Sequence, residues 1–218
     1  RHLNKMKINI LVYSLFLGLI AVSCQSKDQK LPIIGEKEII TRQENGVTIT
    51  DSVYPKIPSF QFLNQDSTYI SDKDFDNKIY VANFFFTHCP SICPTMQRNL
   101  LQAYEKYKGD DRISFLSHSI DFKYDQPSVL KSYADRLGVD NNQWQFVTGS
   151  KAEIYGIADN YLVYAKEDST VAGGYDHTGY LVLIDHEKHI RGAYDGTNDE
   201  QTQQMLKDIE ILLQEYKK

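Results

Sequence analysis

The sequence predicts an α/β fold in which a central, mostly parallel sheet is flanked by helices and carries an antiparallel hairpin. The first observation behind this prediction is the nearly continuous apolar run KIYVANFFF, residues 78–86, which is typical of a strand buried on both faces. The second is the alternation of short strand-like runs with amphipathic helical stretches after it. The third is a pair of apolar runs around the polar turn DHEK, residues 185–188.

The elements follow one another at regular intervals. Two prolines precede alternating apolar positions, so we expect the strands to start near Ser59. After the 78–86 strand, apolar residues at helical spacing predict a helix over 95–109 that ends at Gly109. The remaining predicted elements are strand 112–121, helix 126–138, strand 143–149, helix 150–162, hairpin strands 179–185 and 189–194, and helix 199–218.

Residues 1–23 are predicted to be an export signal rather than part of the fold. Ile8 to Val22 form an apolar run of 15 residues, shorter than the ~20 that a membrane-spanning helix needs. The run ends in AVSC, which resembles the lipobox of bacterial lipoproteins and implies cleavage before Cys24 and acylation of its sulfur. The alternative is a cleaved signal that leaves Cys24 free. Residues 24–52 are expected to tether a folded domain, 53–218, to a bacterial membrane outside the cytoplasm.

The charge balance argues against nucleic acid as a partner. Removing residues 1–23 takes away the positive charges of Arg1, Lys5 and Lys7, so the formal net charge changes from −5 to −8. An acidic domain repels a polyanion, and we therefore expect no binding to nucleic acid.

Two cysteines remain in the predicted domain, in the stretch FFFTHCPSICPTM, residues 84–96. Cys89 and Cys93 lie four positions apart, and each is followed by a proline. Because an exported protein lives where thiols oxidise, the pair is a disulfide, a redox couple or a metal site. Pro94 fits the first turn of a helix, which places Cys93 at the helix N-terminus and Cys89 in the loop before it. The helix dipole favours a thiolate there.

The spacing of the two cysteines favours a site that binds a ligand, such as a metal ion, between the two thiols. Positions i and i+4 of a helix have Cβ atoms about 5–6 Å apart, whereas an unstrained disulfide needs about 3.5–4.5 Å. A metal ion bound to two sulfurs at about 2.3 Å each tolerates the larger separation.

A histidine is the natural third ligand. His177 stands out because it follows two glycines in AGGYDHTGY, on a loop just before a strand, where Asp176 or another carboxylate could orient its imidazole. We expect His88 to point away from Cys89, and His118 to be a core residue. His186 and His189 are expected to be solvated in the hairpin turn. Two thiolates and one imidazole suit copper, which we rank ahead of redox use and of a structural disulfide.

Three stretches, FFFTHCPSICPTM, HSIDFKYDQP and YDHTGYLVLID, resemble in order and spacing the Sco/SenC proteins. This resemblance implies a thioredoxin-like fold and a membrane-anchored protein that assembles the copper centre of cytochrome c oxidase. It implies that Cys89 and Cys93 bind copper and act as a redox pair, and that His177 is the third copper ligand. Copper would be held as Cu(I), Cu(II) or both, and the partner would be the copper-binding subunit of the oxidase or another copper or thiol protein.

The resemblance also matches Asp121 and Asp125 to acidic positions after a core strand. Phe85 and Phe122 depart from the family pattern, and the turn 185–188 lacks the usual Asp-Pro-x-Gly.

Two other functions remain open. The domain could be a thiol–disulfide oxidoreductase that keeps the cysteines of the oxidase subunit reduced, or a thiol peroxidase. The peroxidase needs an arginine beside its cysteine, and we expect Arg98 to face solvent instead.

Overall fold

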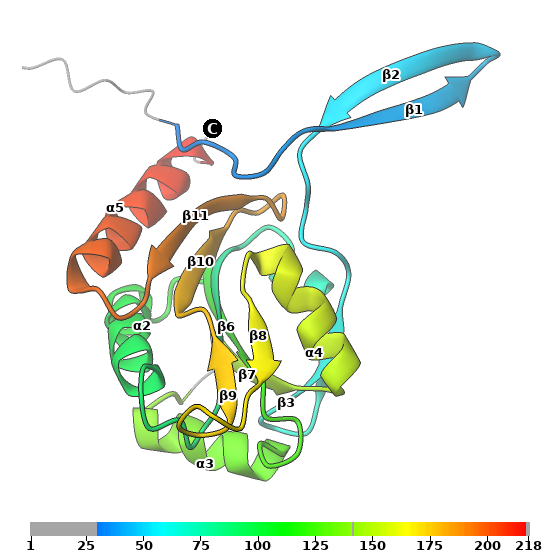
Figure 1. Ribbon diagram of the computed structural model, residues 1–218. Helices are drawn as coiled ribbons and strands as arrows, with labels where there is room; N and C mark the ends of the chain where they lie inside the picture. The colour runs from blue at the N-terminus through cyan, green and yellow to red at the C-terminus, as the bar shows by residue number, and fades with distance from the viewer. Residues whose placement is uncertain (1–29, 141, 217–218) are drawn as a thin grey trace, which may run out of the picture.

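A seven-stranded sheet forms the centre of the computed structural model, which describes residues 30–140 and 142–216 (Figure 1). Its strand order is β11-β10-β5-β6-β7-β3-β4. The strands are β3 Gln61–Asn64, β4 Tyr69–Ser71, β5 Ile79–Phe85, β6 Ile113–Ser119, β7 Trp144–Thr148, β10 Tyr180–Ile184 and β11 Ile190–Asp195.

Parallel pairing is confined to the middle of this sheet. The strands β5, β6 and β7 run parallel, whereas β10 and β11 on one side and β3 and β4 on the other pair antiparallel. The α/β fold class with its hairpin is confirmed, but the sheet is mixed rather than mostly parallel, because only the β5–β6 and β6–β7 pairings are parallel. Every residue of β5 and β6 is buried, as their apolar composition predicts.

Helices cover both faces of the sheet. On one face, the aromatic rings of Phe85 and Phe115 pack against Tyr133 of α3 and Tyr104 of α2. On the other face, Phe84 packs against Tyr161, which follows α4. The helices are α2 Cys93–Tyr107, α3 Pro127–Leu137, α4 Lys151–Ala158 and α5 Asp199–Glu215, with 3-10 turns η1 Asp72–Phe75 and η2 Asp159–Tyr161.

The helix limits follow the predicted signals. Pro127 starts α3, and Gly138 ends it in the left-handed conformation at φ 78°. Ser150 caps α4 in a capping box with Glu153, in which each side chain bonds the other residue's backbone N–H.

A second hairpin precedes the sheet and was not predicted. It consists of β1 Glu38–Glu44 and β2 Val47–Val53, joined by Asn45 and Gly46 at φ 52° and 77°. The prediction that strands start near Ser59 is therefore wrong. Asn-Gly between β-branched residues is a strong hairpin signal, but the polar composition of the segment outweighed it in the sequence analysis.

His189 also departs from its prediction. It is buried rather than solvated, with its ring edge-on to Tyr54 and its Nδ1 3.6 Å from a carboxylate oxygen of Asp185. His186 is partly buried against the ring of Tyr216. The turn is covered because the residues before the sheet and the end of α5 fold over it, which local sequence does not indicate.

Within residues 30–140 and 142–216, no helix has the length and apolar character needed to cross a membrane. The predicted export signal and Cys24 lie outside the described residues.

His118 is a core residue, as predicted. Its ring stacks on Phe84 at 4.6 Å and meets the edges of Phe60 and Phe62. Its Nδ1 lies 3.4 Å from the Asn83 carbonyl, while its Nε2 has no partner among the described residues. Complete burial lowers the pKa of His118 from 6.5 to about 3, so the imidazole is neutral in the folded protein.

This burial predicts a loss of stability in mild acid. Below pH 6.5 the unfolded chain protonates His118 and the folded chain does not, so the free energy of unfolding falls by up to about 1.4 kcal/mol per pH unit. Replacing His118 with Phe removes this contribution and also removes the unpaired Nε2. Urea denaturation at pH 7 and pH 5 should show the variant gaining stability relative to the parent protein as the pH falls. A parallel decline of both proteins would show that His118 does not titrate on unfolding.

Candidate metal centre

The two cysteines lie where the buried strand β5 passes into helix α2. Residues 86–92 form the connection, which carries Cys89, and Cys93 is the first residue of α2 with Pro94 next. A proline at this point removes a backbone N–H that has no partner within the helix. The structure thus confirms the predicted placement of both thiols at the carboxyl end of a central strand.

His177 reaches the thiols from a small separate sheet. It ends β9, Tyr175–His177, which pairs antiparallel with β8, Ala165–Glu167. The connection passes so close to the cysteine loop that a Cβ at Gly173 would lie 2.8 Å from the Phe86 ring and 3.1 Å from Pro90. Gly173 also has φ +88°, so both the space and the backbone require glycine there.

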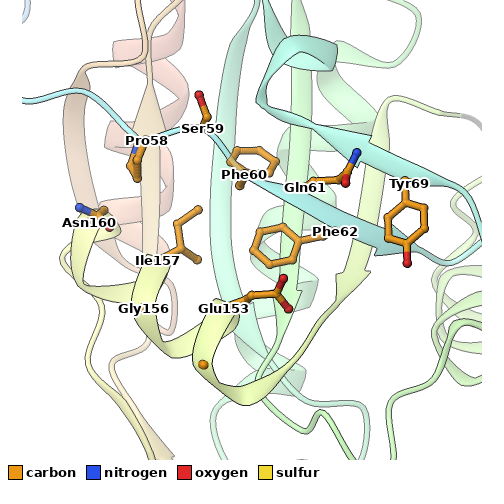
Figure 2. A pocket seen from close by; sticks show the side chains of 11 residues that line it. Pro58, Ser59, Phe60, Gln61, Phe62, Tyr69, Glu153, Gly156, Ile157 and Asn160 are labelled. Atoms are coloured by element: carbon orange, nitrogen blue, oxygen red, sulfur yellow. The ribbon is translucent and has the colours of Figure 1, made fainter.

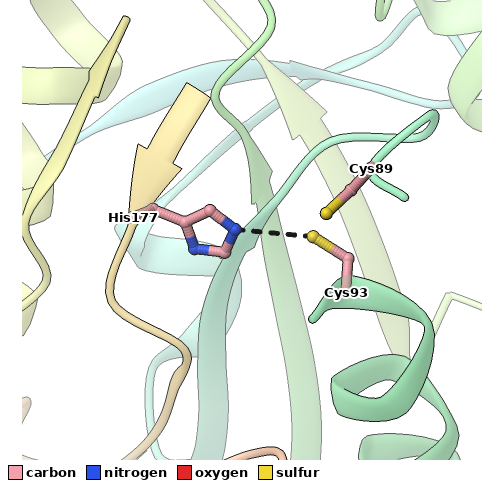
Figure 3. Close-up of side chains that lie close together, drawn as sticks. All are labelled: Cys89, Cys93 and His177. Carbon is pink, nitrogen blue, oxygen red and sulfur yellow. Dashed lines mark hydrogen bonds between the residues drawn. The ribbon is translucent and has the colours of Figure 1, made fainter. Parts of the chain in front are cut away.

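Cys89, Cys93 and His177 converge on one point (Figure 3). Their ligand atoms all lie within 4.8 Å of one another, and the Cys93 Sγ is 3.4 Å from the His177 Nε2. All three residues are buried, and both cysteines are free thiols. Among the described residues, this is the single cluster of three or more His, Cys, Asp or Glu side chains with such geometry.

The His177 imidazole is oriented by the backbone rather than by a carboxylate. Its Nδ1 lies 3.3 Å from the carbonyl oxygen of Thr178, which can only accept a hydrogen bond. With the proton on Nδ1, the lone pair of Nε2 faces the two sulfurs. The expectation that Asp176 or another carboxylate orients the ring is therefore wrong, because the residue after the histidine performs this role.

The two thiols differ in acidity. A hydrogen bond from Cys93 lowers the pKa of Cys89 against the effect of burial, and the Ser91 hydroxyl, 3.5 Å from the Cys89 sulfur, acts in the same direction. The same interaction and burial raise the pKa of Cys93, so the shared proton resides on Cys93. Cys89 is thus a thiolate at neutral pH, next to a protonated and more deeply buried partner.

The three donor atoms fit a single metal ion. Bonds of about 2.3 Å to each sulfur and about 2.0 Å to nitrogen, arranged in a trigonal plane, place the donors roughly 3.7–4.0 Å apart. The observed separations require shifts of well under 1 Å to reach this arrangement. Metal binding displaces the remaining thiol proton, so two thiolates and a neutral imidazole would complete the site.

A buried carboxylate, that of Asp125, holds the loop 86–92 that carries Cys89 in place. Asp125 accepts hydrogen bonds from the backbone N–H of Thr87 at 3.0 Å, from the Thr87 hydroxyl at 2.5 Å and from the Ser119 hydroxyl at 2.6 Å. Burial raises the pKa of Asp125, and these hydrogen bonds oppose that effect. The interaction joins the loop that carries Cys89 to the end of β6.

Asp121 links the two halves of the site. It accepts a hydrogen bond from the Tyr175 hydroxyl at 2.9 Å, two residues before His177, and lies 3.5 Å from the His88 Nε2, next to Cys89. His88 therefore points to Asp121 and away from the thiols, as expected. The contact with Tyr175 was not predicted, because its only sequence signal is a tyrosine two positions before the histidine.

A separate groove of about 530 Å³ lies between β3 and α4 (Figure 2). Phe60 and Phe62 form part of its lining, and Gly156 opens it on the helix side. Its carboxylate is that of Glu153, which is engaged in capping α4. Its lining contains neither cysteine nor histidine, so it offers no soft metal ligand.

The surroundings do not favour a peroxidase. Arg98 is exposed to solvent, as predicted, and the hydroxyl of Thr87 donates to Asp125 instead of facing the thiols.

A dithiol at the end of a central strand, with a histidine brought to it from beyond the next helices, defines a metal-binding protein of the thioredoxin-like class. The family model described as SCO1/SenC matches residues 50–214, and the chain belongs to this family.

Individual relatives are distant in sequence and similar in structure. The SCO1 protein homolog of Bacillus subtilis is 25% identical over 171 residues, covering 75% of this chain and 86% of the relative. A SCO1/SenC family lipoprotein from Bacillus anthracis superimposes with a TM-score of 0.67 at 28% identity, covering 72% of this chain and 95% of that one. ScoI of Bradyrhizobium japonicum with copper bound gives a TM-score of 0.59 at 25% identity, covering 70% and 98%.

The Tyr175–Asp121 contact predicts a positioning effect on the metal site. Tyr175→Phe removes the hydroxyl that ties the His177 strand to the cysteine side, so we expect metal affinity to fall about 10- to 100-fold. A competition titration measures this change, and Tyr164→Phe, an exposed tyrosine just before β8, serves as the matched control. Equal affinities in the Tyr175 variant and the parent would show that the histidine is held in place without this bond.

Proposed function

We propose that this protein is a copper metallochaperone that delivers copper to the copper centre of cytochrome c oxidase. The observation that carries the proposal is the convergence of two thiols and one imidazole within 4.8 Å. Thiolates select soft ions such as Cu(I), and imidazole nitrogen also suits copper, whereas structural zinc normally takes four protein ligands. A family member with copper bound, the Bradyrhizobium japonicum ScoI, supports the choice of metal.

Each of the three residues has a separate role in holding the cargo ion. Cys89 offers a thiolate already present in the apoprotein, and Cys93 offers its sulfur once its proton is displaced. His177 offers the Nε2 lone pair and makes the site suitable for Cu(II) as well as Cu(I). Cys89 is 8% exposed and Cys93 is 1% exposed, so an incoming ligand of the recipient protein meets Cys89 first.

The unequal thiols favour a second function at the same site. A Cys89 thiolate can attack a disulfide of a partner protein and form a mixed disulfide, which releases one partner thiolate. Cys93, after losing its proton, then attacks the Cys89 sulfur and releases the second partner thiol, leaving a Cys89–Cys93 disulfide. This reaction would keep the cysteines of an oxidase subunit reduced, and it makes no use of His177.

Replacing His177 with Ala separates the two functions. The dithiol remains, so reduction of a model disulfide should continue at the parent rate. Copper affinity should fall by more than the ~10–100-fold that is typical of losing a residue that supports a ligand. The affinity for Cu(II) should fall further than the affinity for Cu(I), because two thiolates alone can hold Cu(I). Competition titrations with each oxidation state measure both effects.

The controls distinguish the site from general damage. His186→Ala removes a histidine in the β10–β11 turn and should leave copper affinity unchanged, whereas Cys93→Ser should abolish tight Cu(I) binding. In cells, oxidase maturation should fail with His177→Ala at normal protein levels. Normal maturation would mean that copper at this site is dispensable and that thiol reduction is the function.

We further propose that the mature chain is exported and anchored to a bacterial membrane by lipid on Cys24. The apolar run that ends in Ala21-Val22-Ser23-Cys24 supports this, as does the family lipoprotein of Bacillus anthracis.

Cys24→Ala should therefore leave an unprocessed precursor, because the modifying enzymes act on the cysteine sulfur before cleavage. Mass spectrometry of the membrane fraction measures both the acyl mass and the new N-terminus. A mature N-terminus beyond Cys24 without an acyl chain would exclude the anchor.

A further inference from the structure

The β1–β2 hairpin extends away from the rest of the domain (Figure 1). None of its residues is buried. Backbone hydrogen bonds tie the chain on either side of it to the domain, from the N–H of Ile34 to the Ile190 carbonyl and from the N–H of Ile57 to the Lys188 carbonyl. The family model matches from residue 50, so β1 and the start of β2 lie before the matched residues.

An isolated two-stranded hairpin is marginally stable in water. This one also exposes apolar side chains, with Ile39 at 75% and Val47 at 62%, together with Ile40 and Val53. Within residues 30–140 and 142–216, both of its strands are sheet edges, because the hairpin forms a two-stranded sheet of its own. An open edge of this kind can pair with a further strand.

The two edges differ in how well they are protected against pairing. Charged side chains discourage the addition of a strand, and β1 carries three of them: Glu38, Arg42 and Glu44. Strand β2 has the sequence VTITDSV, with Asp51 as its one charged residue and no proline or lysine. Asp51 is already paired with Arg42 at 3.0 Å. The unprotected edge is therefore β2.

The backbone groups that β2 offers follow from the turn. Glu44 and Val47 flank the two-residue turn and form the first hydrogen-bonded pair of the ladder. Hydrogen-bonded and non-bonded pairs then alternate, so Thr48, Thr50 and Ser52 direct their N–H and C=O groups to the outer edge.

We propose that β2 pairs antiparallel with β2 of a second copy of this chain, around a two-fold axis at Thr50. In the register that overlaps all seven residues, Thr50 faces Thr50 of the second copy and Thr48 faces its Ser52. The outward-facing backbone groups of both copies then meet, and the product is a four-stranded antiparallel sheet.

Side chains make this edge self-complementary. Hydroxyl pairs line one face, and Val47 faces Val53 of the second copy on the other, both of which are favourable cross-strand combinations. No like charges face each other, because Asp51 faces Ile49. The same full overlap of two β1 strands would place Glu38 opposite Glu44 at both ends, where like charges destabilise pairing.

The dimer leaves the metal centre free. The hairpin is attached beside the β10–β11 turn, where β10 ends. Because β5 runs antiparallel to β10, the loop after β5 that carries Cys89 lies at the other end of the sheet. Each copy therefore keeps its cysteine pair open to other proteins. Because seven residues per strand make a small interface, we expect a reversible, concentration-dependent dimer.

Sedimentation equilibrium of the full chain in density-matched detergent tests the proposal, and the parent protein should approach twice the protomer mass as its concentration rises. Thr50→Pro removes the outward N–H at the two-fold axis and leaves the ladder within the hairpin intact, so dimerisation should weaken at least ~10-fold. Thr41→Pro is the matched control, since it removes an outward N–H from β1 instead and should leave the dimer unchanged.

Hydrogen exchange gives a second readout at single residues. In the dimer, the amides of Thr48, Thr50 and Ser52 should exchange slowly, while those of Ile39, Thr41 and Gln43 exchange fast. A protomer mass at every concentration, a dimer that survives Thr50→Pro, or protection on β1 in place of β2 would overturn the proposal. Protection of β2 that appears only on adding lipid vesicles would assign the edge to the membrane surface and overturn it as well.

Discussion

The geometry of the metal centre depends on a buried carboxylate, Asp125, that is not itself a metal ligand. Asp125 is fully buried, and its cost of desolvation is acceptable only because Thr87 and Ser119 supply three hydrogen bonds. Those bonds join the loop after β5 to the end of β6, so the position of Cys89 is set by the central sheet rather than by the loop alone. Asp121 extends the same arrangement through Tyr175 to the strand that bears His177. Two neighbouring acidic residues thus bring together parts of the chain more than 80 residues apart in sequence.

Local sequence patterns were sufficient to predict an element of the fold where burial and local geometry act together. The run 78–86 could be assigned because a strand covered on both faces has to be apolar along its whole length, and α2 because Pro94 and Gly109 bound a periodic stretch. The cysteine pair and His177 could be selected because few residue types bind a soft metal. The hairpin around Asn45 was missed because its apolar side chains are few and exposed, so the segment does not show the apolar pattern of a strand in the core.

Contacts between distant segments account for the other differences. His189 is buried because Tyr54 packs on it from a segment 135 positions earlier, and no periodicity in DHEKH reports that contact. The acceptor for the His177 Nδ1 is a backbone carbonyl, which every residue has, so composition cannot reveal it. The conformation of the turn before β11 also depends on contacts with a distant segment. Lys188 has φ 71°, which favours glycine, and its ammonium group offsets that strain by pairing with Asp72 at 2.6 Å and Asp76 at 3.0 Å.

The metal centre and the attachment of the N-terminal segment lie at opposite ends of the sheet. Arg191 holds the N-terminal segment in place. At the end away from the metal centre, this buried guanidinium bonds the carbonyls of Leu31 and Pro32, together with Asp185 and Glu215. The chain that leads to the hairpin is therefore fastened to β11 and α5 before β1 begins. The buried charges that hold the N-terminal segment, around Arg191, are thus separate from Asp121 and Asp125, which support the segments that carry Cys89 and His177.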